Sequence, residues 1–98
     1  MNEEKILTLH PAGKNGVNIS KAKYDFIRGK MLELLEMGDL PALELSRTLA
    51  DRHQADFDGS IMWYATSVKQ DLEARGILKQ RPKTKPPRWY VDHDVLNA

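Results

Sequence analysis

The chain has 98 residues, 41% of them hydrophobic and 30% charged, with a formal net charge of +1, which is typical of one soluble globular domain and argues against disorder. It contains no cysteine, so disulfides and thiolate metal sites are excluded. No stretch reaches the ~20 apolar residues needed to cross a bilayer, and the acidic N-terminus lacks the apolar run of a signal peptide, so we expect a cytoplasmic protein without membrane contact.

Residues 1–20 are predicted to form an N-terminal arm. Short apolar runs around Ile6 and Ile19 flank a turn-rich stretch that contains Pro11 and Gly13. This pattern fits two extended pieces joined by a turn. We expect the arm to pack on the body of the protein, because its four or five aliphatic side chains would otherwise face solvent.

The first helix is predicted from about Lys21 to Met37, with Ser20 as its N-cap and Gly38 ending it. Residues at helical spacing form one apolar face: Tyr24, Ile27, Met31, Leu34 and Leu35. Phe26 and Met37 fall on the opposite side. Either the N-terminal arm covers these two residues, or they form a subunit interface together with Lys30.

Residues 39–41 are predicted to start a second helix, with Asp39 or Leu40 near its cap and Pro41 in its first turn, where proline is tolerated. This helix should end near Arg52 or His53. Its apolar face consists of Ala42, Leu45 and Leu49.

A connector over residues 54–59 contains Phe57, which we expect to plug the core. The third helix is predicted from about Ser60 to Arg75, followed by Gly76 as its C-cap. Its buried stripe consists of Ile61, Ala65, Val68 and Leu72, with Tyr64 at the edge. The opposite, exposed stripe consists of Trp63, Thr66, Ser67 and Gln70.

Apolar runs at residues 77–78 and 89–91 flank a stretch rich in proline and cations, which predicts a β-hairpin with a loop of about ten residues. We call residues 79–88 the basic segment, because it has five cations and no acid: Lys79, Arg81, Lys83, Lys85 and Arg88. The remainder of the chain therefore sums to −4, and the segment stands out on a slightly acidic body. Trp89 is interpreted as a core strand residue rather than a platform for nucleic-acid stacking.

This order of elements resembles the winged helix-turn-helix superfamily over residues 21–91, above all in the run from Val68 to Lys79. There Leu72 would be the last core anchor, Gly76 would allow a left-handed turn, and Ile77 would begin a strand. The resemblance implies a mainly α fold with a small β-hairpin (α+β), made of three helices and a wing.

Around that winged-helix domain (21–91) we expect the arm over 1–20 and a C-terminal tail over 92–98. The arm lies outside the general winged-helix pattern. His10-Pro11-Ala12-Gly13-Lys14, followed by Lys23-Tyr24 and Ile27-Arg28, resembles the start of a small bacterial family of uncharacterised proteins, which implies a fold and no known activity.

The winged-helix resemblance implies that the third helix enters the major groove of DNA and that the wing lies along the backbone. The exposed stripe of that helix would then touch bases or phosphates, and the cations of the basic segment would neutralise phosphates. The helix departs from a strong DNA binder, because its cations are only Lys69 and Arg75 and because Asp71 and Glu73 add negative charge. Binding led by the wing is therefore expected.

Three functions follow from these patterns. The first is a DNA-binding domain of a small transcriptional or genome-associated regulator, which would need a homodimer or a protein partner for specificity. The alternative is a protein–protein interaction module on the same scaffold without DNA binding, favoured by the exposed Trp63. The third is a small protein that contacts RNA through its wing.

No enzymatic chemistry is predicted. Gly13-Lys14-Asn15-Gly16 lacks the upstream glycine and the Ser or Thr of a phosphate-binding loop, so we interpret it as a turn. The three histidines are far apart in sequence, Asp92-His93-Asp94 is interpreted as solvated tail, and no serine has the context of a nucleophile. We therefore expect no catalytic residue, metal, cofactor or small-molecule substrate.

Overall fold

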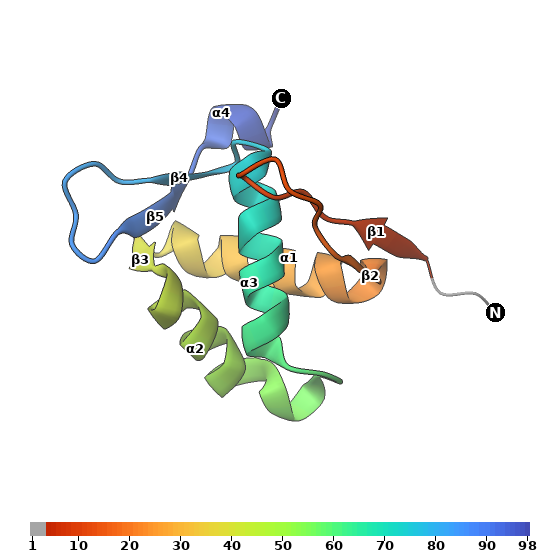
Figure 1. Ribbon diagram of the computed structural model, residues 1–98. Helices are drawn as coiled ribbons and strands as arrows, with labels where there is room; N and C mark the ends of the chain where they lie inside the picture. Colours follow the sequence, from red (N-terminus) through yellow and green to blue (C-terminus); the bar gives the residue numbers. More distant parts are fainter. Residues whose placement is uncertain (1–3) are drawn as a thin grey trace.

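The computed structural model describes residues 4–98 and shows an α+β fold with two small antiparallel sheets (Figure 1). In chain order the elements are β1 (Lys5–Leu7), β2 (Asn18–Ser20), α1 (Lys21–Glu36), β3 (Leu40–Pro41), α2 (Ala42–His53), a 3-10 turn η1 (Gln54–Asp56), α3 (Ile61–Ala74), β4 (Leu78–Gln80), β5 (Arg88–Val91) and α4 (His93–Leu96). Residues 1–3 lie outside the described residues. They belong to the arm expected over 1–20 and to the N-terminus in which no signal peptide was expected.

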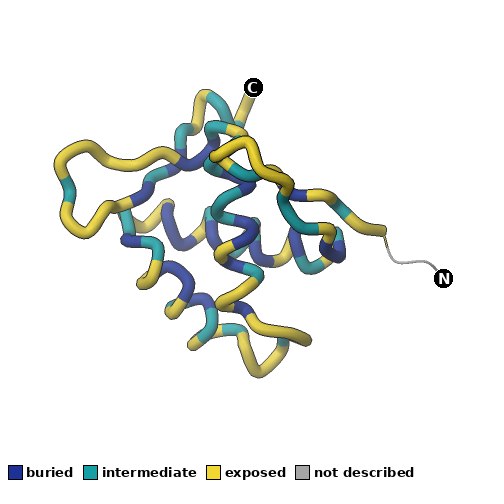
Figure 2. The backbone as a smooth tube through the Cα atoms, viewed as in Figure 1, coloured by how far each residue is buried: buried dark blue, intermediate teal, exposed yellow. Residues whose placement is uncertain are grey.

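The three long helices lie where hydrophobic periodicity predicts them. The Ser20 hydroxyl caps α1 by accepting from the Lys23 N–H at 3.3 Å, and the Ser60 hydroxyl caps α3 by accepting from the Trp63 N–H at 3.3 Å. Gly76, with φ +79°, ends α3 in the left-handed region. The apolar faces predicted for α1 and α3 are buried, and the buried positions of the three helices meet between them (Figure 2).

The second sheet has the strand order β3–β5–β4. Leu40 in β3 pairs with Trp89 in β5, and Leu78 in β4 pairs with Val91. The prediction that residues 39–41 open the second helix was wrong: Pro41 is extended, with ψ 151°, and precedes α2 as its N-cap. Pro41 fits here because β3 is an edge strand, where a missing N–H costs no ladder hydrogen bond.

The N-terminal arm folds back as the β1–β2 pair and lies beside α1 and α3 (Figure 1). Ile19 is buried, and Ile6 and Val17 pack partly buried against the core. Leu7 and Leu9 are 61% and 44% exposed. Three aliphatic side chains of the arm therefore pack on the body, whereas Leu7 is left exposed because a two-stranded ribbon buries only one of its faces, and Leu9 is exposed beyond the end of β1.

The arm does not cover Phe26 and Met37, the two apolar residues on the outer side of α1. Phe26 packs edge-on against the His53 ring at 5.5 Å and lies 5.9 Å from the Phe57 ring, so its aromatic neighbours come from the α2–α3 connection. Phe57 itself packs 5.2 Å from the Tyr64 ring and is partly buried, as expected of a core plug. Met37 is 79% exposed. That these residues form an interface with Lys30 stays a prediction.

His93 and Asp94 are exposed, as expected, but Asp92 pairs with Lys79 rather than facing solvent. The residues of the C-terminal tail are structured. They form α4, in which the Asp92 carboxylate caps the helix by accepting from the Asp94 and Val95 N–H groups at 3.1 and 3.3 Å. Val95 and Leu96 pack against the core. None of the helices in the described part of the chain combines the length and the apolarity that crossing a membrane requires.

Candidate functional site

The β4–β5 hairpin carries the basic segment away from the body of the protein (Figure 1), and nearly all of its loop is exposed (Figure 2). Lys83 and Lys85 lie in this loop, are exposed, and form no ion pair with any residue in the described range 4–98. Their charges are therefore available to an anionic partner.

The other three cations of the basic segment are bound to the body of the protein. Lys79 forms an ion pair with Asp92 at 2.6 Å. Arg81 Nε donates to an Asp39 carboxylate oxygen at 2.7 Å, and Arg88 Nη1 donates to the Asp39 carbonyl at 3.2 Å. The basic segment is thus not a uniform row of free cations.

The two carboxylates that neutralise the hairpin are stabilised in their charged form. The hydrogen bond from Arg81 lowers the pKa of Asp39, and the hydrogen bond from Lys79 lowers the pKa of Asp92. The same bonds raise the pKa of Arg81 and Lys79. Both pairs therefore stay ionised near neutral pH and reduce the positive charge at the base of the hairpin.

The exposed stripe predicted on α3 is only partly exposed. Trp63 is 47% exposed, Thr66 is exposed and Gln70 is half-buried. The prediction for Ser67 was wrong, because it is only 9% exposed. Ser67 lies one turn before Asp71, which accepts hydrogen bonds from Leu9 of the arm and from Tyr24 of α1, so this side of α3 faces both the arm and α1.

Asp71 joins three segments that are distant in the sequence, and it is completely buried. Its carboxylate accepts hydrogen bonds from the Tyr24 hydroxyl of α1, from the Leu9 N–H of the arm at 2.8 Å and from Arg75 Nε at 2.9 Å. Burial, followed by the hydrogen bond to Asp71, raises the pKa of Tyr24 to about 12. Asp71 therefore adds no exposed negative charge to α3, contrary to what the sequence indicated.

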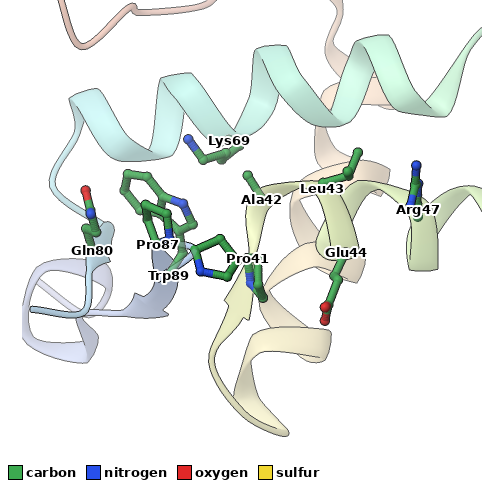
Figure 3. A pocket seen from close by; sticks show the side chains of 10 residues that line it. Pro41, Ala42, Leu43, Glu44, Arg47, Lys69, Gln80, Pro87 and Trp89 are labelled. Carbon is green, nitrogen blue, oxygen red and sulfur yellow. The ribbon is translucent and has the colours of Figure 1, made fainter. Parts of the chain in front are cut away.

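A groove lies between the hairpin and the α2–α3 pair (Figure 3), with a cavity volume of about 470 Å³. Residues from β3, α2, α3 and the hairpin line it, among them Pro41, Ala42, Leu43, Lys69, Pro87 and Trp89. Trp89 is only 8% exposed, which confirms that it is a core strand residue. Lys69 Nζ lies 3.9 Å from the centre of the Trp89 ring, on the side of the groove that α3 forms.

The residues considered for metal or phosphate chemistry do not come together. Within residues 4–98, no group of three or more histidines and carboxylates is placed to hold a metal ion. The Gly13 N–H donates to the His10 carbonyl at 3.0 Å, which makes the glycine-rich stretch a turn of the arm. His93 pairs instead with Glu36 of α1.

The chain is similar to a known protein family over most of its length. The model of a family of unknown function (DUF6958) matches residues 5–89, which include the arm, the three long helices and the hairpin as far as Trp89. No curated protein and no solved structure matches the chain.

Proposed function

The chain belongs to this family of unknown function, and we propose that it is a winged-helix protein that binds double-stranded DNA, led by the loop of its hairpin. The observation that carries the proposal is the pair of exposed, unpaired lysines, Lys83 and Lys85, in a loop that projects beyond the body. Projecting cations can neutralise phosphates without any groove of matching shape.

The arrangement of the elements supports the winged-helix part of the proposal. Three helices are followed directly by a β-hairpin, and the short β3 between α1 and α2 completes the sheet in the order β3–β5–β4. The hairpin and α3 both border the groove of Figure 3, so a wing and a third helix could contact one duplex.

The structure changes the expected strength of the DNA contact. If all the cations of the basic segment contacted phosphates, the affinity for DNA would fall steeply as the salt concentration rises. Lys79 and Arg81 are held by carboxylates and Arg88 donates to the Asp39 carbonyl, so Lys83 and Lys85 are the two cations of the segment with no polar contact to the body within the described residues. For these two lysines we expect a slope of log K against log salt near −1.8, about −0.9 for each neutralised phosphate. Affinity for a generic duplex of ~20 base pairs should then fall about tenfold between about 50 and about 200 mM salt. Fluorescence anisotropy measures both values.

The double variant Lys83→Ala/Lys85→Ala should abolish this salt-dependent binding. The matched control is Lys5→Ala/Lys14→Ala, which removes two exposed lysines from the arm and should leave the affinity and the slope unchanged. Equal losses in both variants, or an unchanged slope in the hairpin variant, would rule out binding led by the hairpin. A duplex RNA that competes better than DNA would move the proposal to RNA.

A second candidate function, association with a protein partner, is favoured by the exposed apolar side chains on α3. Trp63 and Met62 are 47% and 36% exposed and adjacent in the sequence, and large aromatic residues are enriched at protein–protein contacts. In its self-association form, this candidate predicts that Trp63→Ala converts an oligomer to a monomer in sedimentation velocity. The control is Met37→Ala, on the outer side of α1. If this variant, and not Trp63→Ala, becomes monomeric, the contact lies on the α1 surface instead of on α3. A monomeric parent protein would contradict self-association through either surface.

A further inference from the structure

The groove beside Trp89 is longer than its main cavity. A second hollow, of about 260 Å³, lies between α2 and α3 and shares Ala42, Leu43 and Lys69 with the first hollow, of about 470 Å³. The far end of the second hollow is lined by Met62, in the first turns of α3. The two hollows therefore form one elongated groove that runs from the hairpin prolines to Met62, and we call it the α2–α3 groove.

Apolar side chains dominate the α2–α3 groove. Pro41, Pro87 and Trp89 line the end near the hairpin (Figure 3). Leu43 and Met62 are 53% and 36% exposed, so both would lose water contact if a ligand filled the groove. Removing such apolar surface from water is the main favourable contribution to association.

The residues that line the α2–α3 groove include two cations and one carboxylate. Arg47 and Lys69 line it, and Glu44 is the one acidic residue among its lining residues in the described chain. Figure 3 shows the Glu44 carboxylate directed away from Lys69. Lys69 is partly balanced by Glu73 at 3.3 Å, whereas Arg47 forms no ion pair with any residue in the described range 4–98.

We propose that the α2–α3 groove binds an acidic peptide segment of a protein partner, anchored by an apolar side chain against Trp89 and Leu43. A peptide fits better than a compact ligand because the groove is open and elongated, whereas pockets for small molecules enclose most of the ligand surface. It fits better than DNA because apolar walls contribute nothing to phosphate contacts. The proposal does not depend on DNA binding by the hairpin.

Nuclear magnetic resonance on the ¹⁵N-labelled protein tests this proposal, because the chain has two tryptophans and only Trp89 lines the α2–α3 groove. The probe is a panel of short synthetic peptides in which glutamates surround one leucine, phenylalanine or tryptophan. The control panel carries lysines in place of the glutamates. We expect the Trp89 indole signal to shift saturably with acidic peptides, with an affinity at least about tenfold above that of the lysine panel.

Two variants with matched controls complete the test. Leu43→Glu should abolish the shift, whereas Leu7→Glu, at a similarly exposed leucine of the arm, should preserve it. Arg47→Glu should weaken binding about tenfold, whereas Arg52→Glu, also exposed on α2 but outside the groove, should not. The proposal is overturned by no shift at Trp89, by equal shifts with both panels, or by unchanged binding in Leu43→Glu. The Lys83→Ala/Lys85→Ala variant should lose DNA binding but still bind acidic peptides. Peptide binding in this variant would show that the groove acts independently of the hairpin loop, whether or not the loop binds DNA.

Discussion

Replacing Asp71 by alanine is expected to lower the free energy of unfolding by about 3 kcal/mol. The carboxylate is fully buried and accepts from the Tyr24 hydroxyl, the Leu9 N–H and Arg75 Nε. Its removal leaves the hydroxyl and the N–H without their partner away from water, and each such loss costs about 1–3 kcal/mol. Arg75 is 39% exposed and can turn to solvent, so its charge adds less to the loss.

Urea unfolding followed by circular dichroism measures this loss. The matched control is Asp25→Ala, which breaks an exposed ion pair with Lys21 at the same helical spacing as Asp71–Arg75, and which should change stability little. In Asp71→Ala the pKa of Tyr24 should also fall from about 12, because the neighbouring negative charge is gone. Equal stability of the two variants would show that Asp71 does not hold the three segments together.

The substitution Gly16→Ala is expected to displace the N-terminal arm and to cost about 2 kcal/mol, the cost of overpacking a close contact. A Cβ atom at Gly16 would lie 2.0 Å from the Thr8 carbonyl oxygen and 2.3 Å from its hydroxyl oxygen. Backbone atoms cannot yield to such an overlap as a flexible side chain can. The adjacent hydrogen bonds, from the Thr8 N–H to the Val17 carbonyl and from the Val17 N–H to the Thr8 hydroxyl, each 2.9 Å, would break.

Thermal unfolding and amide hydrogen exchange report the displacement of the arm. The Thr8 and Leu9 amides should exchange faster in Gly16→Ala, because both donate hydrogen bonds that hold the arm. The control is Gly29→Ala in α1, where a Cβ would meet nothing within 4 Å. That variant should be more stable by about 0.5–1 kcal/mol, since alanine favours a helix interior. A loss of stability in Gly29→Ala, or none in Gly16→Ala, would contradict the open space around Gly29 and the close contact of Gly16 with Thr8.

Local patterns in the sequence predicted the helices well, and the reason is visible in particular residues. Ile27, Met31 and Leu35 recur at the helical period and all are buried, because one face of an isolated helix must find an apolar partner. Ser20 and Ser60 cap the helices through contacts three residues away, which a sequence shows directly. The strand β3 escaped prediction because two residues carry no periodicity, and only pairing with β5 defines it.

The candidate site depended more strongly on contacts between distant residues. The basic segment was visible in the sequence. However, Arg81 donates a hydrogen bond to Asp39, 42 positions away in the chain, so its charge is already paired and is not available to DNA. Ser67 lies on the predicted outer stripe but is buried, because the side of α3 that it shares with Asp71 faces both the arm and α1. Asp71 meets Tyr24 across 47 positions and Leu9 across 62.

The sequence by itself determined the class of fold, the place of each long helix in the chain, the apolar faces that form the core, and the position of the cationic hairpin. Each of these follows from interactions within a few residues, so a local pattern is sufficient. The tertiary structure decided which cations stay free, which side of α3 the arm covers, and that an apolar groove opens beside the hairpin. Ion pairing, burial and cavity shape depend on which distant surfaces meet, and that is set only when the whole chain packs.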